Sequence, residues 1–378
     1  MDLKALIEMS RKYGADPEYV LAGGGNTSYK ENNVMAVKAS GYALSTIDES
    51  GFVMMDTEKL RKLVDTEYPE DDKEREVCAL KDMMDARLDE SDEKRPSVEC
   101  ILHALFDERF VLHVHPALIN GITCGKNGEA ASGEILGDLK GSFMWVPLTK
   151  PGYILSKVCA EMLSAHAAAY GKQPSIVMLQ NHGIFLAADK TGEIDHIMGE
   201  VVSRIDKKIL RRPALSESAG IHAAYNDSAN AAKNAAINEL DKLNNGSSVI
   251  FMHNNEIAAL TGSHENYSSM LKPFTPDHIV YCRAFPLFAE SIAELGEAFQ
   301  AYEAAHGVKP KIVVIRGLGV FALGKDANEA CIASELYLDM IKIVVYSESF
   351  GGPLALPDYL TDFIINWESE SYRQKKSF

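Results

Sequence analysis

Two histidines lie two residues apart in the stretch VLHVHPALING, at His113 and His115. The run is short and rich in valine and leucine, which predicts a strand. Side chains two residues apart on a strand share one face, so both imidazoles could chelate one metal ion. A histidine on an apolar strand also fits an ordinary core position, and a third ligand is needed to favour the metal.

His182, in the stretch QNHGI, is the best candidate for that third ligand. An Asn-x-Gly corner is typical of a tight turn, from which an imidazole can point into a cleft. Catalytic zinc commonly has three protein ligands and one open position. We therefore predict a site for one divalent metal, with Zn²⁺ as the first candidate and manganese, cobalt or iron as alternatives.

Two further stretches could bind an anion. GGGNTS, residues 23–28, offers backbone N–H groups that can form a nest around a phosphate, although a plain turn is the alternative. It is neither a Walker loop nor a dinucleotide fingerprint.

In RPSVECILH, Pro96 suits the first turn of a helix, which places Glu99 at a helix N-terminus. Glu99 then either caps the helix or, beside a metal, moves protons. His103, on the same helix face, could orient it.

The elements that must position these residues alternate between helical and strand patterns, which predicts an α/β or α+β class. The expected helices and strands are as follows: helices at 4–14, 97–106, about 193–210 and 229–243, acidic helical segments between 56 and about 88, and strands or turns within 20–30, 33–44, 110–118 and 174–190.

The composition changes at RRPALSESAG, where proline and small polar residues indicate a domain boundary. We predict a first domain at 1–212, containing the metal and substrate site, and a C-terminal α/β domain at 213–378 without metal ligands. The second half weakly repeats the first. PKIVVIRGLGVFALGKD matches PSIVMLQNHGIFLAADK, with Leu318 in place of His182, and PDHIVYCRAFPLF resembles ERFVLHVHPALI. As a degenerate repeat, the second copy would have lost the histidines.

The formal net charge is −16, which argues against a general nucleic-acid binder. No stretch is long and apolar enough to predict a membrane span or a signal peptide. The six scattered cysteines fit reduced thiols better than a disulfide framework, so we expect a cytoplasmic protein.

In combination and order, GGGNTS, KASG, RPSVE…H, HVHP and QNHG resemble the class II aldolase/adducin family. The stretches VKASGYALSTIDESGF, VIRGLGVFALGKD and ESFGGPLALPD are similar to the aldolase half of bifunctional rhamnulose-1-phosphate aldolase/alcohol dehydrogenase proteins. The dehydrogenase half is not expected in this chain. The resemblance implies a three-layer α/β/α domain with a central, mostly antiparallel sheet, plus a second, smaller α/β domain. It also implies a homo-oligomer that acts on a small sugar phosphate.

The resemblance also implies roles for individual residues. The metal ligands match His113, His115 and His182, and the catalytic glutamate matches Glu99. The phosphate-binding residues match Asn26, Ser28, Ser40, Gly41 and Ser97. One departure is Val98, where many sugar-phosphate members have a second serine. The residue that serves the oxygen of the departing aldehyde has no match that we can assign.

The implied reaction is cleavage of a ketose 1-phosphate, L-rhamnulose 1-phosphate first, to dihydroxyacetone phosphate and an aldehyde through a zinc-stabilised enediolate. Two alternatives stay open: a sugar-phosphate epimerase or decarboxylase of the same fold, and a non-catalytic binding module like the adducin heads.

Overall fold

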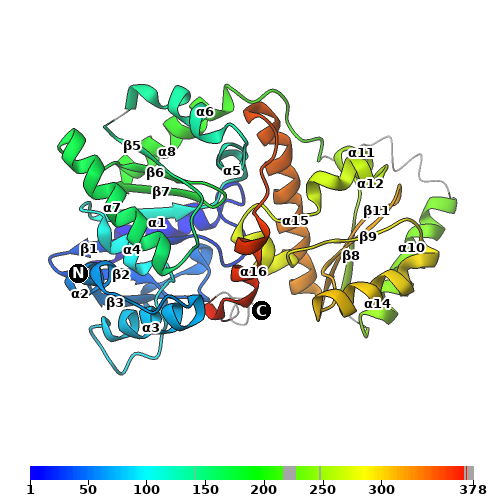
Figure 1. Cartoon of the computed structure of the whole chain (residues 1–378), viewed down its shortest axis with the longest axis horizontal. Coiled ribbons are helices and arrows are strands. Elements are labelled where there is room, and N and C mark those ends of the chain that lie inside the picture. Colours follow the sequence, from blue (N-terminus) through cyan, green and yellow to red (C-terminus); the bar gives the residue numbers. More distant parts are fainter. Residues whose placement is uncertain (140, 216–226, 247, 370–371, 373–378) are drawn as a thin grey trace.

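The computed structural model describes residues 1–139, 141–215, 227–246, 248–369 and 372. Two sheets lie side by side, each covered by helices, and the long helix α15 (Ala327–Ser347) runs between them (Figure 1). In the sequence, the predicted boundary at 212/213 falls after the last strand of the first sheet and before the first strand of the second. Residues 216–226, shortly after it, are outside the described part.

The first sheet has seven strands in the order β3-β2-β1-β4-β7-β6-β5. All neighbouring pairs are antiparallel except β5 and β6, which are parallel. The sheet is thus mostly antiparallel, as predicted. The strands are β1 (Asn26–Glu31), β2 (Val34–Lys38), β3 (Phe52–Asp56), β4 (Phe110–Val114), β5 (Phe143–Val146), β6 (Ile176–Leu179) and β7 (Gly183–Ala188).

Helices cover both faces of this sheet because its strands are apolar on both sides. In β4, Leu112 and Val114 belong to one hydrophobic cluster and Val111 belongs to another. The first face packs against α1 (Lys4–Gly14), α5 (Ala117–Thr123), α6 (Gly128–Ile135) and α8 (Thr191–Asp206), and the second against α2 (Thr57–Lys62), α3 (Asp72–Asp85), α4 (Cys100–Leu105) and α7 (Tyr153–Tyr170). The predicted three-layer α/β/α domain is confirmed.

The second sheet has four strands in the order β8-β11-β10-β9 and forms a smaller α/β unit. Its strands are β8 (Ser248–Met252), β9 (Leu287–Ala289), β10 (Ile312–Ile315) and β11 (Gly319–Gly324). Its helices are α10 (Asp227–Leu243), α11 (Asn255–Thr261), α12 (His264–Tyr267), α13 (Pro276–Cys282), α14 (Leu295–His306) and α15, followed by α16 (Asp358–Asn366).

The second sheet repeats part of the first. Strands β8, β11, β10 and β9 follow the same order and the same parallel and antiparallel pairing as β4, β7, β6 and β5. The registers agree as well: Leu179 pairs with Gly183 across β6 and β7, and Ile315 pairs with Gly319 across β10 and β11. The match between these two hairpins, found in the sequence, therefore has a structural basis.

The other proposed match is wrong. Residues 276–282, expected to correspond to the strand with the two histidines, form the helix α13. Every residue of that helix is buried, and a fully buried segment shows no periodicity that separates a helix from a strand. The true counterpart of β4 is β8. Val114 pairs with Ile184 and Met252 with Val320, which places His253 at the position of His115. The second copy has therefore kept one of the histidines.

The two units pack closely through α5 and α15. Gly121 of α5 lies against Tyr346 of α15, and a Cβ atom at Gly121 would come within 2.4 Å of the Tyr346 Cβ. This glycine allows the two helix backbones to approach. The contact holds the smaller unit against the end of β4, where His115 lies.

Candidate functional site

The three predicted histidines converge. His113 is in β4, His115 is the residue after its end, and His182 lies in the turn between β6 and β7. One nitrogen of each ring lies within 4.8 Å of the others, and the Nε2 atoms of His113 and His115 are 2.8 Å apart. Within the described part of the chain, this is the one group of three His, Cys, Asp or Glu side chains placed to hold a metal.

The other ring nitrogen of two of these histidines is already bonded. Nδ1 of His113 donates to the carbonyl of Ile184 (3.0 Å), and Nδ1 of His115 donates to Oδ2 of Asp277 (2.6 Å). Burial of the ring lowers the pKa of His113 to about 4, which favours the neutral imidazole. Both Nε2 atoms therefore present lone pairs to each other, an arrangement that a cation between them would stabilise.

Gly183 makes the close approach of the rings possible. A Cβ atom there would lie 2.5 Å from Cδ2 of His115 and 2.6 Å from the carbonyl oxygen of Val114. Two residues further along β7, Phe185 stacks on His113 with ring centroids 4.0 Å apart. The position of the imidazoles is thus fixed by the strand that follows the His182 turn.

Glu99 completes the cluster. Its Oε1 atom lies 3.2 Å from Nε2 of both His113 and His182, and its Oε2 atom accepts a hydrogen bond from Nδ2 of Asn26 (2.6 Å). The helix α4 begins only at Cys100, so Pro96 lies before the helix, and the Glu99 side chain does not cap it. The capping interpretation is wrong.

The cluster fits a divalent metal. The buried Oε1 atom of Glu99 has no hydrogen-bond partner of acceptable geometry, yet it lies against two imidazole nitrogens. Tetrahedral Zn–N bonds of about 2.0–2.1 Å place ligand atoms roughly 3.3 Å apart. The Nε2 atoms of His113 and His115 lie 2.8 Å apart, and Oε1 of Glu99 lies 3.2 Å from Nε2 of His113 and His182. Three nitrogens and one carboxylate oxygen therefore suit a small, oxygen- and nitrogen-seeking cation.

Asn26 and Ser28, expected to bind phosphate, have other partners in the structure. Nε2 of His103 donates to Oδ1 of Asn26, and the hydroxyl of Ser28 donates to Nδ1 of His103 (2.7 Å). His103 therefore orients Glu99 through Asn26 rather than directly. Because Ser28 is fully buried, its hydroxyl has no path to a ligand, and the structure does not support that part of the phosphate prediction.

The remaining predicted phosphate residues lie together beside the glycine loop. The amide of Ser40 bonds to the carbonyl of Arg95 (2.8 Å), and the amide of Ser97 bonds to the carbonyl of Lys38 (2.9 Å). Gly41 adopts φ = 87°, which favours glycine. The ammonium of Lys38 is buried and donates to the carbonyl of Gly23 (3.2 Å). Lys38 is the first residue of the KASG stretch, but the sequence analysis assigned it no role.

A narrow cavity of about 20 Å³ reaches Glu99 and the imidazoles of His115 and His182. Its other walls are Gly25, Asn26, Val98, Pro151, Gly152, Pro276 and Trp367. Pro276 and Trp367 belong to the C-terminal part of the chain, which the predicted division gave no part in the site. Neither residue showed a signal in the sequence.

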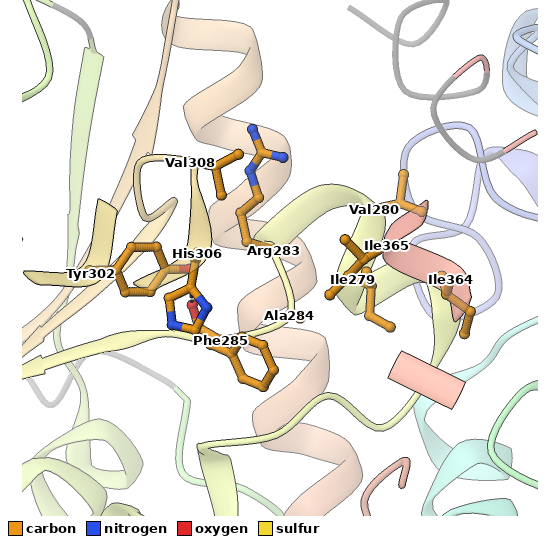
Figure 2. A pocket seen from close by; sticks show the side chains of 10 residues that line it. All are labelled: Ile279, Val280, Arg283, Ala284, Phe285, Tyr302, His306, Val308, Ile364 and Ile365. Atoms are coloured by element: carbon orange, nitrogen blue, oxygen red, sulfur yellow. Dashed lines mark hydrogen bonds between the residues drawn. The ribbon is translucent and has the colours of Figure 1, made fainter. Parts of the chain in front are cut away.

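A larger cavity, of about 160 Å³, lies between α13, α14 and α16 in the second unit (Figure 2). Figure 2 shows Phe285, Tyr302 and His306 on one side and Ile279 and Ile364 on the other. Its walls contain no carboxylate and only one histidine, so it lacks the group of ligands found around Glu99. This larger cavity is therefore not the candidate metal site.

Among the described residues, no helix combines the length and apolar character needed to cross a bilayer. The six cysteines are all free thiols.

Comparison with known proteins gives relatives for both units. Residues 4–203 match the family described as Class II Aldolase and Adducin N-terminal domain, and residues 296–361 match the family described as Aldolase class II, second domain. A Bacillus subtilis (strain 168) protein, described as Uncharacterized oxidoreductase YuxG, is 24% identical over 424 residues. The alignment covers 98% of this chain and 58% of that relative, so the chain spans less than two thirds of the relative's length.

Among solved structures, the N-terminal class II aldolase domain of a conserved Thermoplasma acidophilum protein is 28% identical, with a TM-score of 0.46. The match covers 55% of this chain and 93% of that one. An L-fuculose-1-phosphate aldolase from Thermus thermophilus is 14% identical, with a TM-score of 0.35, over 54% of this chain and 94% of that one. Because the family match covers more than half of the sequence and includes the three histidines and Glu99, this chain belongs to the class II aldolase and adducin family.

Proposed function

We propose that this protein is a metal-dependent aldolase, a lyase that cleaves a ketose 1-phosphate to dihydroxyacetone phosphate and an aldehyde. L-rhamnulose 1-phosphate is the first candidate substrate. The observation that supports the proposal best is the position of Glu99, whose carboxylate lies 3.2 Å from two of the three imidazoles predicted to hold the metal. A binding module would need neither the three converging nitrogens nor a buried carboxylate beside them.

In this proposal, His113, His115 and His182 hold one divalent cation, with Zn²⁺ as the first candidate. The cation would supply Lewis-acid stabilisation of the negative charge left on the substrate when the carbon–carbon bond breaks. In cleavage, the carboxylate of Glu99 would receive the proton released by the hydroxyl group that becomes the aldehyde, and would deliver it to the carbon that loses its partner. In the synthetic direction, the same proton would move from that carbon to Glu99 and on to the aldehyde oxygen. Asn26 and His103 hold the carboxylate in place through their hydrogen bonds.

The phosphate group is proposed to lie by the glycine loop, near Ser40, Gly41 and Ser97. The buried ammonium of Lys38 adds a positive charge there. Binding the phosphate at this remote point fixes the reacting carbon against Glu99. Val98 lines the cavity where many relatives have a serine, so we expect fewer hydroxyl contacts to this anion than in those relatives.

We also infer that the chain is related to the aldolase half of bifunctional rhamnulose-1-phosphate aldolase/alcohol dehydrogenase proteins. Two observations support this inference. A second unit follows the aldolase unit, and the Bacillus subtilis relative is both longer and described as an oxidoreductase. The subgroup gives the reason to test rhamnulose 1-phosphate first.

The decisive assay supplies metal-replete protein with L-rhamnulose 1-phosphate and detects dihydroxyacetone phosphate, with and without a chelator. Release that the chelator abolishes supports the aldolase. An epimeric sugar phosphate or carbon dioxide as the product would replace the aldolase with another reaction at the same site. No turnover and no bound metal would favour the binding-module alternative.

A further inference from the structure

We propose that Asp277, which lies in the second unit, is a positioning residue for the metal ligand His115, so that both units of the chain build the metal site. This inference rests on the metal site of the proposed function. It adds a residue far from the family's first-unit motifs, because 162 positions separate the two partners in the sequence.

The contact is short and buried. Oδ2 of Asp277 lies 2.6 Å from Nδ1 of His115, and the two side chains are 8% and 11% exposed. An ionised carboxylate can only accept a hydrogen bond, so Nδ1 carries the proton and Nε2 of His115 is left bare. Nε2 is the atom that faces His113. A carboxylate bonded in this way fixes the tautomer and the orientation of a metal-binding imidazole and makes it a stronger ligand.

The glycine loop makes room for this contact. A Cβ atom at Gly24 would lie 3.3 Å from Oδ2 of Asp277 and 3.0 Å from the carbonyl oxygen of Leu21. A side chain at this position would therefore crowd the carboxylate. The loop that is predicted to bind phosphate thus also admits a residue from the second unit.

The position of Asp277 depends on the core of the second unit. Asp277 is the second residue of α13, a helix that is buried along its whole length. Tyr281 of the same helix packs in a cluster with Tyr337 and Ile341 of α15, and Ile279 packs with Leu360 of α16. Because α13 is held on two sides, the carboxylate has little freedom to move away from His115.

The charges also agree with a divalent cation. Glu99 and Asp277 contribute two carboxylates to a cluster of imidazoles, and both side chains are almost fully buried. Buried carboxylates are stable when they are paired with cations or bonded to donors. One divalent cation would balance both negative charges. It would balance the charge of Glu99 directly and that of Asp277 through the ring of His115.

The counterpart of His115 in the second unit is bonded differently. His253, at the position of His115, donates from Nδ1 to the carbonyl of Leu318, and Phe251 occupies the position of His113. Leu318 itself stands where the first unit has His182. Among the described residues, the second copy has no three-histidine group. In this proposal, the second unit contributes the carboxylate of Asp277 to the metal site of the first.

The test measures metal affinity in the full chain, without any turnover. Metal-free protein is titrated with Zn²⁺ in competition with a chromogenic chelator, for the wild type, Asp277→Asn, Asp277→Ala and Asp339→Asn. We expect Asp277→Ala to bind Zn²⁺ about 10- to 100-fold more weakly. Asp277→Asn should lose less, because its amide oxygen still accepts the hydrogen bond from His115.

Asp339→Asn is the matched control. Asp339 is also buried, lines the same small cavity as His115 and Asp277, and lies 3.7 Å from Nε2 of His278. Loss of the Asp339 carboxylate should leave the Zn²⁺ affinity close to that of the wild type. The melting temperature of each metal-free variant separates a folding defect from a metal defect, and the absorption spectrum of bound Co²⁺ in Asp277→Asn reports a changed ligand geometry directly.

The outcomes are distinguishable. Wild-type affinity in Asp277→Ala, or an equal loss in Asp339→Asn, would overturn this inference and leave the proposed function intact. Absence of metal binding in the wild type would overturn the proposed function itself. If Asp277→Ala fails to fold, the isosteric Asp277→Asn decides: wild-type affinity together with a wild-type Co²⁺ spectrum would overturn the inference.

Discussion

The carboxylate of Glu99 lies 3.2 Å from Nε2 of His182, a contact that joins the start of α4 to the turn between β6 and β7. The two residues come from distant segments of the first unit, and both line the same narrow cavity. In the proposed reaction, a carboxylate in this position would be close enough to exchange protons with a substrate at the metal site. The predictions below follow from this arrangement and from its support.

Glu99→Gln should lower kcat by about 10²- to 10⁴-fold, because the amide cannot exchange the proton. KM should change little, since the amide oxygen still accepts the hydrogen bond from Asn26. The metal should still bind through the three imidazoles, although more weakly without the charge of the carboxylate. Steady-state kinetics and metal analysis of the same preparation test this. Glu256→Gln, a buried glutamate paired with Arg211 in the second unit, is the control and should retain kcat. Near wild-type turnover in Glu99→Gln would remove Glu99 from the reaction.

Gly183→Ala should lose metal and destabilise the fold by about 1–3 kcal/mol, because the added methyl group meets His115 and the backbone of Val114. Zn²⁺ competition and urea unfolding measure the two effects. Gly133→Ala is a suitable control, since no atom lies within 4 Å of the added carbon and the site is helical. If Gly183→Ala keeps wild-type metal affinity, the tight approach of the imidazoles has no role in binding.

Ser40→Ala should raise KM for the sugar phosphate by about 10-fold or more, because a hydrogen bond to the charged phosphate is lost. The change in kcat should be smaller. Ser45→Ala, in an exposed position nearby, should leave KM unchanged. Initial rates over a range of substrate concentrations separate the two constants. An unchanged KM in Ser40→Ala would place the phosphate elsewhere.

Lys30 should make stability depend on pH. Its ammonium is buried behind the site and donates to the carbonyl of His103 (2.8 Å). Burial, assisted by Arg61, lowers the pKa of Lys30 from 10.5 to about 7. Between these values the unfolded chain binds the proton and the folded chain does not, so stability should rise as pH increases from about 7 to about 10.5.

Lys30 can raise the free energy of unfolding by at most about 1.4 kcal/mol per pH unit. Lys30→Met removes the ionisable group, so its stability should lack this contribution. Urea unfolding of both proteins at several pH values between about 7 and about 10 measures the difference. A difference in unfolding free energy that stays constant with pH would show that Lys30 is not the group responsible.

Local rules in the sequence were sufficient for the centre of the site. His113 and His115 share a face because strand side chains alternate, and His182 follows from turn chemistry at Asn181, which adopts φ = 55°. The helix at 4–14 and the hairpin around Gly319 also follow from local pattern, and the structure has both. The α/β class follows from the alternation of these elements.

The tertiary structure decided which partners those residues have. The hydrogen bond between His115 and Asp277 joins two units, and no local pattern records it. Asn26 could equally face a ligand or Glu99 from its strand, and the packing of α4 on the sheet chose Glu99. Residues 276–282 were assigned to a strand because burial on every side removes the periodicity that identifies a helix. The residue types and their spacing determined the chemistry of the site, whereas its support depends on contacts between distant segments that only the packed chain brings together.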